Sequence, residues 1–318
     1  MSDTKPVLVS GIKPTGDLHI GNYFGAMRQF VELTKEGKYR PFIFVADYHA
    51  LNTMQDAEEM RKRTREIVMA YLAVGLDPKE VVFFKQSDVP AHTELAWIFE
   101  TITTMPYLMR AHAFKDAEAK NKEINVGTFN YPMLMAADIL LYDASVVPVG
   151  ADQKQHIEIA RDTAEKFNRV FKTEVFKLPE PYIMPDVAVV PGTDGQKMSK
   201  SYGNVIPLFA SREELAKAVM GIVTNSSEGK PDNLYNIHRL VRSESELDGP
   251  YGTGGNFKAL KEMLIEDLDH YFAPIRGVYE GLQNDPDVVE KLLEAGKREA
   301  RAISEAKMEQ VRRAIGVA

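Results

Sequence analysis

The sequence predicts an α/β protein in which a helix-covered parallel sheet is followed by an all-helical region. Over the first two-thirds of the chain, short apolar runs alternate with segments of helical periodicity, a pattern typical of a parallel sheet with helices on both faces. From residue 207 onward the strand signals disappear and only helical segments follow. A chain of 318 residues also exceeds the usual size of one core. We therefore predict two domains, residues 1–206 and 207–318.

Each predicted element follows from its local pattern. The apolar runs predict strands at 7–12, 41–46, 81–84, 146–149 and 187–190. Helical periodicity predicts helices at 22–35, 57–74, 93–103 and 152–169, the second ending at Gly75, a typical stop. In the helical region we expect helices at 212–222, 232–241, 256–277 and 286–315. The Ser-, Gly-, Asp- and Pro-containing stretch 243–256 is expected to be a loop.

The composition excludes several classes of protein. With no cysteine, disulfide frameworks and thiolate zinc sites are excluded and a reducing compartment is favoured. The N-terminus shows no signal-peptide pattern, and no apolar run approaches the ~20 residues of a bilayer span. We therefore expect a cytoplasmic protein without a membrane partner. A net charge of −7 argues against a protein that coats nucleic acid through positive charge alone.

A local basic surface is still possible along the predicted helix 286–315. Its cations are Lys297, Arg298, Arg301, Lys307, Arg312 and Arg313. Three glutamates, at 299, 305 and 309, lie between them. A solvated helix face of mixed charge is therefore the favoured interpretation over an RNA-binding face.

Two short segments about 180 residues apart carry the most information. The first is His19-Ile20-Gly21-Asn22, which follows a glycine- and proline-containing turn after the first strand. A helix that begins at Asn22 offers free amides to phosphate, and Gly21 would let an adenine ring approach the backbone. His19 could donate to a triphosphate in the transition state. For this segment alone, a purely structural turn explains the residues equally well.

The second segment, Lys197-Met198-Ser199-Lys200-Ser201, follows a loop that contains Gly192 and Gly195. Two lysines on such a loop can close over a leaving pyrophosphate and act mainly in the transition state. An exposed basic loop would be the commoner explanation of this segment by itself. The two segments together, in this order, predict a site that activates an amino acid with ATP.

These segments match the two signatures of the class I aminoacyl-tRNA synthetases, which the chain resembles. Within that class it is similar to the bacterial enzymes for tryptophan, through residues 11–23, 130–142, 149–156 and 255–258. The resemblance covers nearly the whole chain. It implies a Rossmann-like catalytic domain, an anticodon-binding helical domain, a homodimer, and ATP, Mg²⁺, L-tryptophan and tRNA(Trp) as cofactors and partners.

The resemblance also implies roles for individual residues. It assigns catalysis to His19, Lys197 and Lys200, and no protein side chain to a metal. The residues it implies for ATP are Lys13, Pro14, Thr15, Gly21, Asn22, Gly150, Ala151, Asp152, Val189, Lys197, Met198, Ser199, Lys200 and Ser201. Those it implies for tryptophan are Asp138, which would accept the indole N–H, with Met135, Tyr131, Gln153 and His49.

Asp138 can also be interpreted without the resemblance. It lies inside the apolar run 133–141, where an unpaired charge would be costly, so we expect an indole or a neighbouring hydroxyl as its partner. A carboxylate that faces one ring N–H would favour tryptophan over phenylalanine, which offers no donor.

Three positions depart from the family pattern. Lys13 replaces a usual glutamine, Ala117 a usual lysine and Ala151 a usual acidic residue. We hypothesise that Lys13 supplies the positive charge missing at position 117. Three alternatives stay open: a tyrosyl-tRNA synthetase, a synthetase-like protein that binds tryptophan or RNA without charging tRNA, and a cofactor-forming nucleotidyltransferase.

Overall fold

The centre of the molecule is a five-stranded parallel sheet with the strand order β3-β2-β1-β4-β5. The computed structural model describes residues 5–14, 16–119, 124–150, 153–183, 189–224, 231–252 and 256–318. The strands are β1 (Val7–Ile12), β2 (Arg40–Val45), β3 (Val82–Lys85), β4 (Val146–Val149) and β5 (Glu180–Ile183). The predicted parallel sheet is confirmed, and its first four strands were located to within one residue.

The prediction of the last strand was wrong. Val189 and Val190 are not in a strand, and positions 187 and 188 lie outside the described residues. The fifth strand is β5, at the edge of the sheet next to β4. It contains Pro181 and the exposed Tyr182, as edge strands tolerate, and so it lacks the apolar run by which the other strands were found.

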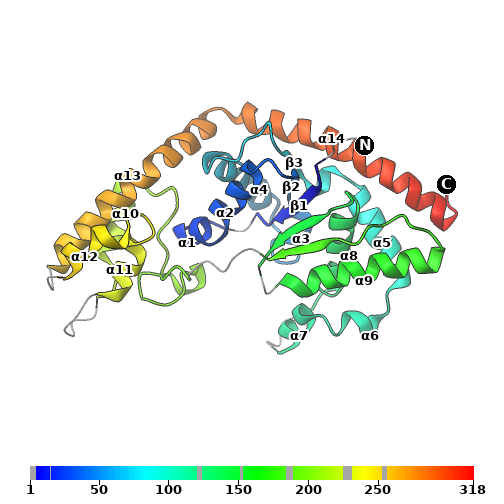
Figure 1. Cartoon of the computed structure of the whole chain (residues 1–318), viewed down its shortest axis with the longest axis horizontal. Coiled ribbons are helices and arrows are strands. Elements are labelled where there is room, and N and C mark those ends of the chain that lie inside the picture. The colour runs from blue at the N-terminus through cyan, green and yellow to red at the C-terminus, as the bar shows by residue number, and fades with distance from the viewer. Residues whose placement is uncertain are drawn as a thin grey trace.

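Helices cover both faces of the sheet (Figure 1). Successive strand residues point to opposite faces. One face of the sheet packs against α2 and α4 in an apolar cluster that includes Leu8, Ile43 and Phe83. The other face packs against α5, α8 and α9 in a second cluster that includes Val9, Phe42 and Phe84. The helices of this part are α1 (Ile20–Asn22), the π-helix η1 (Tyr23–Met27), α2 (Arg28–Lys35), α3 (Asp47–Ala50), α4 (Ala57–Ala73), η2 (Gln86–Asp88), α5 (Ala91–Ile102), α6 (Met105–Leu108), α7 (His112–Ala119), α8 (Val126–Leu140) and α9 (Lys154–Phe171).

The C-terminal part is helical, as predicted. Its helices are α10 (Arg212–Met220), α11 (Asp232–His238), α12 (Glu244–Gly252), α13 (Phe257–Asn284) and α14 (Pro286–Ile315), and the short η4 (Lys200–Tyr202) precedes them at the second signature segment. In Figure 1, α10, α11 and α12 gather around the first part of α13, away from the sheet. None of the described helices has the length and apolar character needed to cross a membrane.

Helix α12 was expected to be loop. Gly249 and Pro250 weaken its helical signal. Leu247 and Tyr251, four residues apart, are both buried, and this pair on one helix face holds the segment against its neighbours. Tertiary packing therefore overrides the local preference for a loop.

Helix α14 returns from the helical region and packs beside β3 at the sheet edge. Its basic residues explain how it is held. Lys307 Nζ donates to the Val175 carbonyl at 2.8 Å and pairs with Asp143 at 2.7 Å, while Arg312 forms two hydrogen bonds with Glu94 at 2.7 Å. For these residues the prediction of a solvated mixed-charge face was wrong, because they dock the helix onto the sheet-containing part.

Candidate active site

Residues of both signature segments line one cavity of about 530 Å³, which we call the loop cavity. It is lined by His19, Gly21, Asn22, Gly25, Val189, Val190, Lys197, Met198, Ser199 and Tyr202. The structure thus brings together residues 178 positions apart, as the sequence predicts. Gly25, Val190 and Tyr202 are additions that the sequence analysis did not include.

Close packing at two glycines joins these segments. A Cβ atom on Gly21 would lie 2.8 Å from His19 Nδ1 and 3.3 Å from Met198 Cβ. Gly16 has a φ of +55°, and a side chain there would collide with the ammonium group of Lys200. Only glycine allows this approach, so the second lysine of the signature rests against the turn that precedes His19.

His19 is buried, with 8% of its surface exposed. Its backbone N–H donates to Asn22 Oδ1 at 3.0 Å, which fixes the start of α1. Among the described residues, no hydrogen-bond partner reaches its buried Nδ1 atom. Burial, and secondarily the charge of Lys200, lower the pKa of His19 to about 4. The imidazole is therefore neutral near pH 7 and can donate one hydrogen bond to a ligand.

This lowered pKa makes stability depend on pH. The unfolded chain binds a proton at His19 below its ordinary pKa of 6.5, whereas the folded chain does so only near 4. We therefore expect the free energy of unfolding to fall by roughly 2 to 3 kcal/mol between these pH values because of this residue. In urea titrations at pH 7 and pH 4.5, His19→Asn should lose less stability than the wild type. The control is His270→Asn, at an exposed histidine, which should lose as much stability as the wild type. Equal losses of stability in His19→Asn and the wild type would contradict the expectation.

Asn204 organises the loop that carries the lysines. Its side chain is buried, accepts from the Ser199 amide at 2.7 Å, and donates to Asp194 Oδ1 at 2.6 Å and the Lys197 carbonyl at 3.2 Å. It thus fixes the backbone of the signature at Lys197 and Ser199. Asn204 was not predicted from the sequence, because its hydrogen bonds reach back across a turn to residues 194–199, and a linear pattern does not reveal the geometry of that turn.

A second cavity, of about 480 Å³, lies at the carboxyl ends of the strands and contains Asp138; we call it the carboxylate cavity. It is lined by Val9, Gly11, Lys13, Phe44, Ala46, His49, Tyr131, Met135, Asp138, Ile139, Val147, Gln153 and His156. Every residue that the resemblance implies for tryptophan is in this set. Its walls combine aromatic and aliphatic side chains with a few polar groups, as is usual for a small-molecule site.

Helix α8 provides one wall of the carboxylate cavity. It begins at Asn125, whose side chain accepts from the Thr128 amide at 2.7 Å, a regular N-cap. Tyr131, Met135 and Asp138 are spaced four and three residues apart, so they share one helix face, and all three line the cavity.

Asp138 is 2% exposed and has protein partners on both oxygens. Oδ1 accepts from Gln86 Nε2 at 2.7 Å and contacts His92 Nδ1 at 2.6 Å, while Oδ2 contacts His49 Nε2 at 2.8 Å. We expected an indole or a hydroxyl as the partner of Asp138, whereas its partners within the chain are one amide and two imidazole groups. Gln86 and His92 were not predicted, although Gln86 lies two residues after the predicted strand 81–84 and directly follows β3.

The three partners keep Asp138 ionised. Burial opposes its charge, but the hydrogen bonds and charges of the two histidines outweigh burial and lower its pKa. A carboxylate offers about four acceptor positions, and three are used here. Oδ2, with one partner, can accept one further hydrogen bond from the cavity.

The remaining predicted residues are placed as follows. Lys13 lines the carboxylate cavity, and burial lowers its pKa. Gly150 follows β4 directly, Pro14 is buried, and the Ser201 hydroxyl lies 2.8 Å from that of Ser199. Thr15, Ala151 and Asp152 lie outside the described residues, as does the side chain of Ala117.

Comparison with known proteins gives consistent results along the chain. Residues 1–267 match the family model described as tRNA synthetases class I (W and Y). A tryptophan–tRNA ligase of Fusobacterium nucleatum subsp. nucleatum is 46% identical, with 97% of each chain aligned. The structure of tryptophanyl-tRNA synthetase from Campylobacter jejuni with ADP and tryptophan is 42% identical and superimposes with a TM-score of 0.91 over 97% of this chain and 99% of that one. A tyrosyl-tRNA synthetase from Archaeoglobus fulgidus, 21% identical with a TM-score of 0.65 over 87% of this chain and 91% of that one, shares the fold alone.

Proposed function

This chain belongs to the tryptophan–tRNA ligases, within the class I tRNA synthetases, and we propose that it activates L-tryptophan with ATP and transfers it to tRNA(Trp). One observation supports the first step above all: residues of both signature segments line a single cavity. The cavity that contains Asp138 supports tryptophan as the amino acid.

In the proposed reaction the tryptophan carboxylate attacks the α-phosphorus of ATP. The bond from that phosphorus to the bridging oxygen breaks, and tryptophanyl-adenylate and pyrophosphate form. No covalent enzyme intermediate is needed, so catalysis consists of positioning and charge stabilisation. We assign this stabilisation to His19, Lys197 and Lys200, and the binding of the ribose to Gly150 and the two residues after it.

For the amino acid, we propose that Asp138 Oδ2 accepts the indole N–H and that Met135 packs beside the ring. Tyr131, Gln153 and His49 would hold the amino and carboxyl groups. This proposal is supported by the free acceptor position of Asp138 and by the shared helix face of Tyr131, Met135 and Asp138.

Mg²⁺ is proposed as the companion of ATP. Among the described residues, no group of three or more metal-ligating side chains gathers at one point. We propose that phosphate oxygens and water hold the ion. Bound in this way, it would neutralise phosphate charge.

The helical region 207–318 is proposed to bind the anticodon of tRNA. Because basic residues of α14 are used to dock that helix, we assign the anticodon contact to α10, α11, α12 and the first part of α13 (Figure 1). Splayed single-stranded bases would be recognised there by stacking and edge contacts.

We also propose a homodimer that acts in the cytoplasm, as the family resemblance implies. Three helices carry large exposed apolar side chains: Trp97 on α5, Met105 on α6 and Val126 on α8. Such side chains support a contact with a second subunit at these helices. Sedimentation equilibrium of the full chain tests the dimer, and cell fractionation tests the location.

The proposed function is tested by ATP–pyrophosphate exchange with each of the twenty amino acids, followed by aminoacylation of total tRNA. Exchange with tryptophan alone, together with charging, is expected. Exchange with tyrosine would favour a tyrosyl enzyme, and exchange without charging a non-charging relative. No exchange with any amino acid would favour a nucleotidyltransferase or a regulatory binder.

Lys13 is expected to contribute to ATP use. Its position in the carboxylate cavity places a cation near the proposed meeting point of the two substrates. We expect Lys13→Gln to lower kcat/KM for ATP about 10-fold, the effect of losing one charge-assisted hydrogen bond. The exposed Lys5, just before β1, gives the control Lys5→Gln. Unchanged ATP affinity and turnover in Lys13→Gln would refute the hypothesis that Lys13 supplies the positive charge missing at position 117.

A further inference from the structure

Residues 206–211, which we call the linking segment, connect the second signature with α10 and the rest of the helical region. Its first half is hydrogen-bonded around His19. The Ile20 amide donates to the Ile206 carbonyl at 3.0 Å, and the Leu208 amide donates to the Leu18 carbonyl at 2.9 Å. His19 and Pro207 face each other as an antiparallel bridge. The backbone position of His19 is therefore set by the linking segment.

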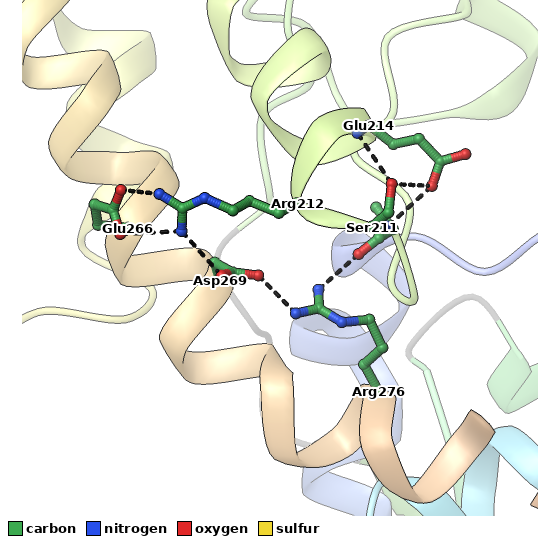
Figure 2. Close-up of polar contacts among 7 residues, drawn as sticks. Ser211, Arg212, Glu214, Glu266, Asp269 and Arg276 are labelled. Atoms are coloured by element: carbon green, nitrogen blue, oxygen red, sulfur yellow. Dashed lines mark hydrogen bonds and ion pairs between the residues drawn. The ribbon is translucent and has the colours of Figure 1, made fainter. Parts of the chain in front are cut away.

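The second half of the linking segment is held by α13. Arg276 Nη1 donates to the Ala210 carbonyl at 2.7 Å, and Nη2 donates to Asp269 Oδ1 at 2.6 Å. Figure 2 shows Arg276 between Asp269 and the residues that begin α10. One turn further along α13, Tyr279 stacks on Phe209 at 3.8 Å between ring centroids. Two side chains of α13 thus fix the backbone and a ring of this segment.

A second arginine in Figure 2 touches the same helix in a different way. Arg212, the first residue of α10, pairs with Glu266 and with Asp269 at 3.1 Å. Its side chain is 52% exposed, against 17% for Arg276, and among the described residues its guanidinium pairs with the carboxylates of α13 alone. Such pairs contribute little. Arg276, largely buried, instead reaches the main chain of the linking segment, whose first half is hydrogen-bonded to the residues on either side of His19.

We infer that Arg276 is a positioning residue for adenylate formation, acting through the linking segment on His19. The inference rests on the proposed function, because it assigns Arg276 to that same reaction. A displacement of about 1 Å in a group that acts on the transition state can cost about 10²-fold in rate. The carboxylate cavity is lined by residues of β1, β2, β4, α3, α8 and α9 and by Lys13, Ala46 and Gln153, and no residue of the linking segment is among those that line it. Loss of Arg276 therefore affects turnover and leaves tryptophan binding intact.

The test compares Arg276→Met with Arg212→Met in the full chain. In ATP–pyrophosphate exchange we expect Arg276→Met to lower kcat at least 10-fold with an unchanged KM for tryptophan, while Arg212→Met stays within about 2-fold of wild type. Arg276→Lys, which keeps the positive charge but loses the fixed fork of the guanidinium, should give an intermediate kcat. Equal kcat values for the two methionine variants, or a loss only in the KM for tryptophan, would overturn the inference.

A second measurement separates this inference from the proposed function. Hydrogen–deuterium exchange of the Ile20 and Leu208 amides reports the two bonds that hold His19, whatever the reaction. Both amides should exchange faster in Arg276→Met and at the wild-type rate in Arg212→Met. Unchanged exchange in Arg276→Met would overturn the positioning role even if wild-type activity is as proposed. Absent tryptophan-dependent activity in the wild type would instead refute the proposed function.

Discussion

Replacing Lys200 with methionine is expected to lower the kcat of tryptophan-dependent ATP–pyrophosphate exchange by about 10²- to 10³-fold, as loss of one preorganised charge-stabilising group does. Methionine keeps much of the length of the side chain and removes its charge. Burial lowers the pKa of Lys200, while the nearby Asp17, itself paired with Arg63, raises it. The loss should appear mainly in kcat, because the ammonium acts on negative charge that develops as pyrophosphate leaves.

The resting contacts of Lys200 sharpen this expectation. Its ammonium lies against Gly16, at the turn before His19, so the charge is close to the first signature segment. Lys217→Met, which removes an exposed lysine from α10, controls for a general effect of charge and should retain wild-type exchange. If Lys200→Met keeps kcat within about 3-fold of wild type, Lys200 lacks the role assigned to it.

Much of the fold could be predicted because it depends on local pattern. The buried strands β1, β2, β3 and β4 are apolar runs, and helices such as α4 have regular periodicity and clear ends. β5 was missed because an edge strand need not be apolar, and α12 because its burial depends on distant partners. Neither feature leaves a signal in a short window of sequence.

The candidate site was predictable to a similar extent. The two signatures were found by their residue patterns, and the helix neighbours of Asp138 through the family resemblance; the structure places His19, Gly21, Asn22 and Lys197–Ser199 along the loop cavity, and Asp138, Met135 and Tyr131 along the carboxylate cavity. Gln86, His92 and Asn204 were not found, since each acts on a partner brought close only by the fold. The same holds for Arg276, whose contact with Ala210 joins positions 66 residues apart.

Asp138→Asn is the second substitution with a large expected effect. The amide keeps the volume of the carboxylate but not its charge, and its NH₂ group must face one of the donors Gln86, His92 or His49. We expect the free energy of unfolding to fall by about 1 to 3 kcal/mol, as for a buried donor left unpaired. We also expect kcat/KM for tryptophan to fall on the order of 10²-fold, because the indole N–H loses a charged acceptor.

A tryptophan analogue with sulfur in place of the ring N–H distinguishes recognition from structural support. It has nothing to donate, so exchange with the analogue should change little between wild type and Asp138→Asn, while exchange with tryptophan collapses. Asp47→Asn is the matched control: Asp47 is also buried, accepts from the Ser87 amide at 3.0 Å, and does not line the carboxylate cavity. Asp47→Asn should lower the free energy of unfolding without changing the ratio of the exchange rates with tryptophan and with the analogue. If Asp138→Asn lowered the exchange rates with both substrates equally, the carboxylate would only orient His49, His92 and Gln86. The selection of tryptophan would then have to come from the shape of the cavity.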